Sequence, residues 1–242
     1  MNSKKLFVII PAAGRSVRMG GEVPKILMDV EGIPVIGRTL IAFERFEAEG
    51  YDVKIIVVTA LPLAPDIRKI AEEYGITRLL DIVEGGDTRT GSVYNGVMYA
   101  RTHGADDDDL IFIHDGARCL IDSTTLSNCL KGMASHDICA AAVPVKSTIK
   151  EIQKTADGEC LVTRTPDRDL LMEIQTPQCF TVNKALACYG YSKENNIIAT
   201  DDTALAEELG FEVYLVQGAY TNIKITTPED IPMASSIARR EC

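Results

Sequence analysis

The loop within IIPAAGRSVRMGGEVPK, residues 9 to 25, carries two spaced cations among small residues. Arg18 and Lys25 lie seven positions apart, and Pro24 restricts the backbone immediately before the lysine. Glycines on such a loop let a ligand approach the backbone closely. Two cations on a glycine-rich loop that follows a strand suit a bound triphosphate. The alternative is a turn after a buried strand, with two solvated basic side chains.

This loop departs from two common phosphate-binding fingerprints. A dinucleotide fingerprint requires G-x-G-x-x-G at the start of a helix, but here Gly14 is followed by Ser16 where the second glycine should stand. A P-loop requires G-x-x-x-x-G-K-[ST], but the glycine pair 20–21 is followed by Glu22. A nicotinamide dehydrogenase is therefore the least favoured function, and a triphosphate loop of another kind is favoured.

Four later stretches also carry groups suited to ligand binding. They are VEGGDTRTGSV at 83–93, IFIHDGAR at 111–118, TPQCF at 176–180 and TNIKITTPEDI at 221–231. In the first, Asp87 and Ser92 place polar groups near a predicted helix start, where anions and polar ligands bind. Asp115 ends a predicted strand, and Lys224 lies in an alternating segment. The alternatives are a structural turn cap for Asp115 and a solvent-facing side chain for Lys224.

The elements that position these residues are predicted from apolar runs. LFVII, VKIIVVT, LLDIVE, LIFIHD, ICAAAVPV and FEVYLVQ show little alternation, as expected of strands covered on both faces. Helical patterns lie between them, including one that Thr200 caps and Gly210 ends. Alternating strands and helices predict an α/β fold with a doubly wound, mainly parallel sheet, which binds ligands at the carboxyl ends of its strands.

One segment interrupts this alternation. KSTIKEIQKTADGECLVTRTPDR, residues 146–168, places two polar, β-branched stretches around Asp157 and Gly158, a strong hairpin pair. Neither stretch has a clean core face. The hairpin therefore either extends to a partner or lies on the surface in solvent.

Composition narrows the partners. The 242 residues suit one large α/β domain or two small ones, and the net charge of -10 argues against nucleic acid or an anionic membrane as partner. Seven cysteines without a CxxC pair and three scattered histidines give no zinc-site spacing and indicate reduced thiols. The apolar stretch Leu6 to Ile10 is too short for a signal-peptide core or a membrane span, so a cytoplasmic protein is predicted.

The five stretches in this order resemble the 2-C-methyl-D-erythritol 4-phosphate cytidylyltransferase family, within the superfamily of sugar-nucleotide pyrophosphorylases and cytidylyltransferases. The resemblance covers nearly the whole chain. It implies one nucleotidyltransferase domain with a Rossmann-like sheet over residues 1–242. The implied reaction joins CTP to methylerythritol phosphate and releases pyrophosphate. The implied cofactor is Mg²⁺, held mainly by the triphosphate, with Asp115 as the candidate protein ligand.

The resemblance also implies roles for individual residues. The expected catalytic residues are Arg18, Lys25 and Lys224. The expected nucleotide contacts are Ala12, Ala13, Gly14, Gly86, Asp87, Ser92, Asp115 and Gly116. The expected contacts with methylerythritol phosphate are Asp115, Thr148, Arg168, Thr176 and Lys224. Residues 146–170 would form a dimerisation arm that brings Thr148 and Arg168 to the active site of the partner in a homodimer.

The chain departs from the family pattern at two motifs. HDGARC, residues 114–119, stands where the family usually has H-D-A-A-R-P, and Ser16 replaces a second glycine. Glycine for alanine preserves a backbone contact, whereas loss of the proline leaves the following turn less fixed. Two other functions remain open: a ribitol 5-phosphate cytidylyltransferase, which shares the motifs, and a nucleotide-binding regulator without turnover. The joint presence of Arg18, Lys25, Asp115 and Lys224 argues against the regulator.

Overall fold

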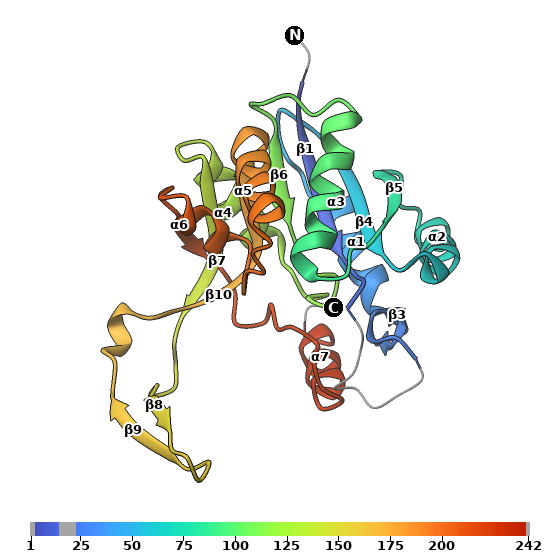
Figure 1. The fold of residues 1–242 in the computed structure, drawn as a ribbon. Helices are drawn as coiled ribbons and strands as arrows, with labels where there is room; N and C mark the ends of the chain where they lie inside the picture. Colours follow the sequence, from blue (N-terminus) through green and yellow to red (C-terminus); the bar gives the residue numbers. More distant parts are fainter. Residues whose placement is uncertain (1–2, 15–22, 241–242) are drawn as a thin grey trace.

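The apolar runs form one seven-stranded sheet in the computed structural model, which describes residues 3–14 and 23–240 (Figure 1). The order across the sheet is β11-β7-β10-β6-β1-β4-β5. The strands are β1 (Lys4–Pro11), β4 (Tyr51–Thr59), β5 (Leu79–Glu84), β6 (Leu110–Ile113), β7 (Ile138–Pro144), β10 (Met172–Thr181) and β11 (Tyr214–Gln217). All six predicted runs are strands of this sheet.

The sheet is parallel except at β10. β1 pairs in parallel with both β4 and β6, and β5 and β11 extend the two sides in parallel. β10 runs antiparallel to both of its neighbours, β6 and β7, and its register shifts between Ile174 and Gln178. The predicted doubly wound, mainly parallel fold is confirmed. The reversed strand β10 was not among the predicted strands.

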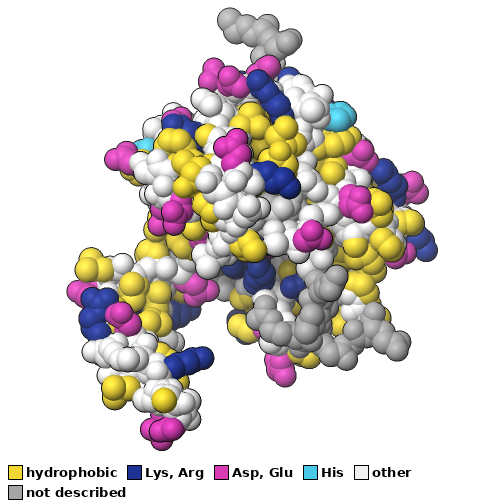
Figure 2. Space-filling view, in the orientation of Figure 1, with side chains coloured by type: hydrophobic (Ala, Val, Ile, Leu, Met, Phe, Trp, Pro, Cys, Tyr) yellow, Lys and Arg dark blue, Asp and Glu magenta, His cyan; other side chains and the backbone are white. Residues whose placement is uncertain are grey.

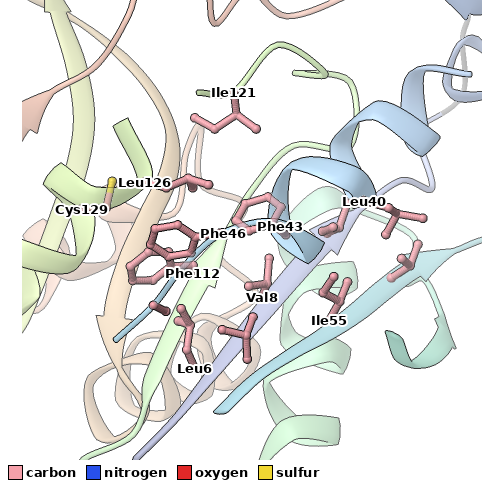
Figure 3. Close-up of a cluster of buried hydrophobic side chains, with 14 of the residues drawn as sticks. Leu6, Val8, Leu40, Phe43, Phe46, Ile55, Phe112, Ile121, Leu126 and Cys129 are labelled. Carbon is pink, nitrogen blue, oxygen red and sulfur yellow. The ribbon is translucent and has the colours of Figure 1, made fainter. Parts of the chain in front are cut away.

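Helices cover both faces of the sheet and bury a core on each. They are α1 (Val35–Glu44), α2 (Ala64–Glu73), α3 (Arg89–Thr102), α4 (Ser123–Met133), α5 (Val182–Asn195), α6 (Thr203–Glu208) and α7 (Asp230–Ala238). Successive residues of β1 point to opposite faces, so Val8 packs with Leu40 and Phe43 of α1 (Figure 3), whereas Ile9 packs with Val97 of α3. Burial on both faces explains why β1, β4, β6 and β7 read as apolar runs, whereas β5 and β11 at the edges of the sheet are more exposed.

A smaller third core supports the loops at one end of the sheet. It joins α7 to β2 (Asp29–Val30) and to the segment after β6, and it includes Val30, Cys119, Ile225 and Ala234. β2 pairs with β3 (Ile33–Pro34), just after the short 3-10 helix η2 (Lys25–Leu27). Cys119 is buried there as a small apolar side chain, and burial raises the pKa of its thiol to about 11.

The start of α6 differs from the prediction. The helix begins at Thr203, so Thr200 does not cap it. Asp201 takes that role in part, because its carboxylate accepts a hydrogen bond of 2.8 Å from the backbone N–H of Ala204. A carboxylate so close to the first turn satisfies a free N–H that a threonine further upstream does not reach. The predicted end is confirmed, since Gly210 follows the helix with a φ of +72°.

The predicted arm is a hairpin that projects from the body (Figure 1). β8 (Glu151–Lys154) pairs antiparallel with β9 (Cys160–Arg164), and Gly158 lies in the turn between them with a φ of +83°. Every residue of both strands is exposed. The 3-10 helices η4 (Arg168–Leu170), which returns the arm to β10, and η3 (Leu61–Leu63), which follows β4, complete the fold. No helix within the described ranges is long and apolar enough to cross a membrane.

Two helical glycines allow a matched test of core packing. A Cβ at Gly96 of α3 would lie 2.6 Å from Ile9 Cγ2 and 3.0 Å from Val58 Cγ2, whereas a Cβ at Gly190 of α5 would have no neighbour within 4 Å. We expect Gly96→Ala to lower the free energy of unfolding by about 1–3 kcal/mol through overpacking. Gly190→Ala should raise it by roughly 0.5–1 kcal/mol through helix propensity. Urea denaturation of both variants measures this, and equal effects would contradict the packing described.

Candidate functional site

A cleft of about 720 Å³ opens where β1, β4, β5 and β6 end. Predicted ligand-binding residues that line it are Ala12, Ala13, Gly14, Lys25, Gly86, Asp87, Ser92, Asp115 and Lys224. Figure 2 shows dark-blue basic side chains gathered in a hollow between the body of the molecule and the region of α7. Arg18 and Ser16 lie outside the described residues. The candidate site therefore lies at the carboxyl ends of the strands, where parallel sheets bind their ligands.

The loops after β1 and β5 close against each other through small residues. Ala12 continues the pairing of β1, because its N–H donates to the carbonyl of Val58 at 2.7 Å. Gly85 lies so near that a Cβ there would be 2.8 Å from the Cβ of Ala13. A Cβ on Gly86 would be 2.8 Å from the carbonyl carbon of Gly91. These glycines thus allow the chain's own loops to approach each other closely.

Ser92 and Thr88 fix the loop that leads into α3. Thr88 is the N-cap residue, and its hydroxyl accepts a hydrogen bond of 2.9 Å from the N–H of Gly91. The buried Ser92 hydroxyl accepts from the N–H of Gly86 at 3.1 Å and lies 2.9 Å from the Thr88 carbonyl, to which it donates. Asp87, which lies between Gly86 and Thr88 in the chain, is exposed in the cleft. Ser92 shapes this wall of the cleft, and its predicted contact with the base stays a prediction.

Asp115 lies in the cleft beside three cations. Its carboxylate is 2.7 Å from Lys224 Nζ, 3.2 Å from Arg89 Nη2 and 3.7 Å from Arg118 Nε, although only 10% of the side chain is exposed. Burial alone would raise the pKa of Asp115, but the charges of Arg89 and Lys224 hold it well below its usual range. Asp115 is therefore ionised at neutral pH, and it orients the cations around it.

A hydrogen-bond chain beneath the cleft fixes the backbone of this loop. The N–H of Asp115 donates to Thr176 Oγ1 at 3.1 Å, and the same hydroxyl lies 3.1 Å from His114 Nδ1. His114 Nε2 lies 3.0 Å from the carbonyl of Arg118, which can only accept. The network therefore assigns the proton to Nε2, and the Thr176 hydroxyl donates to Nδ1. Thr176 is buried below the cleft rather than lining it, and its expected contact with substrate stays a prediction.

Lys25 and Lys224 are brought together from the two ends of the chain. Lys25 Nζ donates to the carbonyl of Ile225 at 3.0 Å, and Lys224 is the neighbouring residue. Ile225 is itself anchored in the third core, and its N–H donates to the carbonyl of Ala117 at 2.9 Å. Both lysines thus line the cleft close to each other in space, and their expected contacts with phosphate stay a prediction.

Gly116 does not line the cleft. Its N–H donates to Pro11 at 3.2 Å, its carbonyl accepts from Thr39 Oγ1 at 3.1 Å, and a Cβ would lie 3.2 Å from Ile10 Cγ2. Glycine at this position fits the tight contact of the loop with the core. The expected ribose contact of Gly116 stays a prediction.

Thr148 and Arg168 lie on the exposed arm and are not part of this cleft. Arg168 Nη1 donates to the carbonyl of Lys146 at 3.1 Å and lines a separate hollow of about 610 Å³ at the base of the arm. Lys146 Nζ stands 3.4 Å above the ring of Tyr220. Within one chain, the structure therefore does not bring these two expected substrate contacts to the other site residues.

Arg89 and Arg118 are site residues that sequence reasoning did not identify. Arg89 lines the cleft at the first turn of α3, and Arg118 donates from Nη1 to the carbonyl of Asn222 at 2.7 Å. Both stand in motifs that were singled out, DTRTGS and HDGAR. The pairing of Arg89 with Asp115 depends on the tertiary fold because 26 positions separate them, whereas Arg118 lies only three positions after Asp115.

The cleft offers oxygen ligands of the type that Mg²⁺ prefers, the carboxylates of Asp87 and Asp115. No group of three or more histidine, cysteine, aspartate or glutamate side chains suited to a metal ion occurs in the part of the chain that the structure describes. These donors fit an ion that takes most of its ligands from phosphates and water rather than from a protein cage.

The buried histidine generates a pH prediction. Burial lowers the pKa of His114 from 6.5 to about 4. The unfolded chain therefore gains a proton at higher pH than the folded chain. The free energy of unfolding should thus fall as the pH drops from about 6.5 towards 4, by about 3 kcal/mol in all and by roughly half of that above pH 5. Urea denaturation at several pH values measures this slope.

A matched pair of variants assigns the slope to its residue. His114→Gln should remove most of the change between about pH 6.5 and 5. His103→Gln changes an exposed histidine and should leave it in place. The burial argument fails if the wild-type slope is absent, or if the His114 variant keeps it in full.

The chain is similar to a known protein family over nearly its whole length. The family model IspD, 2-C-methyl-D-erythritol 4-phosphate cytidylyltransferase, matches residues 6–240. A curated relative of that description from Alkaliphilus oremlandii is 38% identical over 99% of this chain and 98% of its own length. Another, from Nostoc sp., is 36% identical over 96% of this chain and 97% of its own.

Solved structures agree in fold. The 4-diphosphocytidyl-2C-methyl-D-erythritol synthase from Anaerococcus prevotii superposes with a TM-score of 0.80 at 29% identity, covering 99% of this chain and all of that one. The 2-C-methyl-D-erythritol 4-phosphate cytidylyltransferase of Francisella tularensis gives 0.78 at 26% identity, covering 96% and 99%. With a family model and relatives that span nearly all of it, the chain belongs to the IspD family of 2-C-methyl-D-erythritol 4-phosphate cytidylyltransferases.

Proposed function

We propose that this chain transfers the cytidylyl group of CTP to 2-C-methyl-D-erythritol 4-phosphate and releases pyrophosphate. The observation that carries the proposal is the cleft at the carboxyl ends of the strands, where Lys25 and Lys224 stand beside the ion-paired Asp115. A binding protein without turnover needs no such set of cations aimed at a reacting phosphate. Membership of the family supports this activity over that of a regulator.

The reaction needs charge neutralisation more than proton transfer. An oxygen of the substrate's phosphate attacks the α-phosphorus of CTP, a P–O bond forms, and the bond to the β-phosphate breaks as pyrophosphate leaves. A phosphate monoester is already largely ionised near neutral pH, so no general base is required. His114 could not serve as one, because it is fully buried and both ring nitrogens are hydrogen bonded below the cleft.

The two lysines can neutralise the charge that develops on the phosphates. An ammonium group has three donors, and Lys224 uses one on Asp115 while Lys25 uses one on the Ile225 carbonyl. The ammonium group of Lys224 keeps donors that can reach phosphate oxygens, and Lys25 lines the same cleft. Preorganised charge of this kind supplies most of the catalysis in phosphoryl and nucleotidyl transfer. The proposal assigns Arg18, outside the described residues, to the same task.

The opposite wall is suited to the nucleoside. Ala12, Ala13 and Gly14 leave space beside the loop of Gly86 and Asp87, and these residues are proposed to contact the base and ribose. Bound Mg²⁺ would offset charge on the triphosphate, with Asp115 as the proposed protein ligand. The proposal also keeps the cytoplasmic location that the sequence predicts.

We further propose that the arm joins two copies of the chain. Large apolar side chains of the arm are exposed, with exposures of 45% at Ile152, 59% at Leu161 and 81% at Leu170. A two-stranded hairpin with such a surface is only marginally stable by itself. A second copy would cover it, and it would bring Thr148 and Arg168 to a cleft that they do not line in their own chain.

A comparison of acceptors tests the proposed reaction. With CTP and Mg²⁺, we expect pyrophosphate release to require 2-C-methyl-D-erythritol 4-phosphate, because the relatives that match nearly the whole chain carry that name. Ribitol 5-phosphate serves as the competing acceptor. Faster release with ribitol 5-phosphate would reassign the substrate, and release with neither would favour a binding protein.

Mixed dimers test the shared site. Lys25→Ala and Arg168→Ala should each lose roughly 10²–10³-fold in turnover, by analogy with the loss of one oxyanion donor. If Arg168 acts in the partner's cleft, each mixed dimer holds one intact site, and an equal mixture should recover about a quarter of wild-type activity. Arg164→Gln, at an exposed arm residue paired with Glu151, is the matched control and should stay near wild type. Subunit exchange without recovery, or a monomer in solution, would contradict the shared site.

A further inference from the structure

A buried ion pair lies directly behind the cleft. Arg89 Nη1 lies 2.7 Å from Asp202 Oδ1, and Arg89 Nη2 lies 2.7 Å from Asp202 Oδ2, so the pair is bidentate. Asp202 is only 1% exposed and does not line the cleft, whereas Arg89 does. In the sequence 113 positions separate the two residues. Asp202 therefore cannot touch a substrate and can affect the reaction only through other residues.

Arg89 connects this pair to the reactive side of the cleft. Its Nε and Nη2 both lie 3.2 Å from Asp115 Oδ1, while Asp115 Oδ2 lies 2.7 Å from Lys224 Nζ. The order of contacts is thus Asp202, Arg89, Asp115, Lys224. Burial alone would lower the pKa of Arg89, but the charges of Asp202 and Asp115 keep it raised. Arg89 is a fixed cation between two carboxylates.

Asp202 is itself held rigidly. The hydroxyl of the buried Tyr189 donates to Asp202 Oδ1. The backbone N–H groups of Asp202 and Thr203 both donate to Gln178 Oε1 at 2.8 Å. Gln178 lies on β10 just after its register shift. The carboxylate thus has its place fixed by α5 and β10 before Arg89 binds it.

Stability alone does not account for this arrangement. A buried ion pair gains little over well-packed apolar side chains, because both charges lose their hydration. What the bidentate pair supplies is orientation, since the planar guanidinium is held by two parallel hydrogen bonds. The Nη1–Nη2 edge of the guanidinium is committed to Asp202, and its Nε–Nη2 edge meets Asp115 at Oδ1. Asp115 Oδ2 is left for Lys224.

We propose that Asp202 and Arg89 are positioning residues for the transfer reaction, with Asp202 orienting Arg89 so that Asp115 and Lys224 take the arrangement that the substrates require. Without Asp202, the fork of Arg89 is free to take both oxygens of Asp115 or to turn towards a bound phosphate. Either movement displaces Lys224. The inference rests on the proposed function.

A double-mutant cycle on the full-length enzyme tests the proposal. We expect Asp202→Asn and Arg89→Gln each to lower kcat about 10- to 100-fold, by analogy with the outer partners of metal ligands. Because Asp202 acts through Arg89, the double variant should be no slower than Arg89→Gln alone. Arg89→Lys keeps the charge without the fork and should stay clearly below the wild type.

Asp201→Asn is the matched control. Asp201 is the neighbouring carboxylate, but it bonds the N–H of Ala204 and not Arg89. The Asp201→Asn variant should keep kcat within about twofold of the wild type. Melting temperatures and the folded fraction are measured for every variant, because a purely structural role would lower these and leave kcat per folded molecule unchanged.

The outcomes separate the two proposals. A wild-type enzyme that does not release pyrophosphate with CTP and the methylerythritol phosphate acceptor refutes the proposed function. If the wild type is active, three results would each overturn the positioning role alone: unchanged kcat in Asp202→Asn, losses that multiply in the double variant, or full activity in Arg89→Lys.

Discussion

The carboxylate of Asp115 is buried, and a buried charge must be compensated where it lies. The compensation comes from three separate parts of the chain: Arg89 at the start of α3, Arg118 in the loop after β6, and Lys224 near the C-terminal end. If one of these parts moves, Asp115 loses a compensating cation in a low-dielectric site. The need to pair Asp115 therefore holds the walls of the cleft in register.

The supports of this cluster converge on one irregular part of β10. Thr176 holds the backbone of Asp115, Gln178 holds the segment of Asp202, and Gln175 holds Asn222 in the segment that leads to Lys224. Gln175, Thr176 and Gln178 are all buried, and they belong to the stretch where the register of β10 shifts. A regular strand would use its backbone groups in the sheet and give these side chains no common direction. The register shift therefore groups these buried polar side chains of β10 beneath the cleft, within a largely apolar sheet.

The polar stretch of β10 also shows where the sequence predicted the fold and where it did not. Six strands were predicted from apolar runs with little alternation, a signal visible in any short window. MEIQTPQCFT, residues 172–181, lacks that signal because polar residues and a proline interrupt it. Lys25 and Asp115 were found because they stand in motifs next to predicted strand ends, whereas Lys224 was found through the resemblance of its motif to the family. Asp202 was missed because its partner is Arg89, 113 positions away in the sequence. No local sequence pattern indicates such a pairing.

The cleft also shows how a strongly acidic protein can hold a highly charged anion. The chain carries a net charge of -10, so its overall field repels a nucleoside triphosphate at a distance. Salt limits that repulsion to about 8–10 Å, whereas the cations at Lys25, Arg89 and Lys224 act at contact range within a partly buried site. Because buried charges are screened far less than exposed ones, the local cluster dominates once the ligand enters. Binding of an anion in the proposed site then depends on where a few cations lie, and the carboxylate of Asp115 is compatible with it because Arg89 and Lys224 compensate its charge.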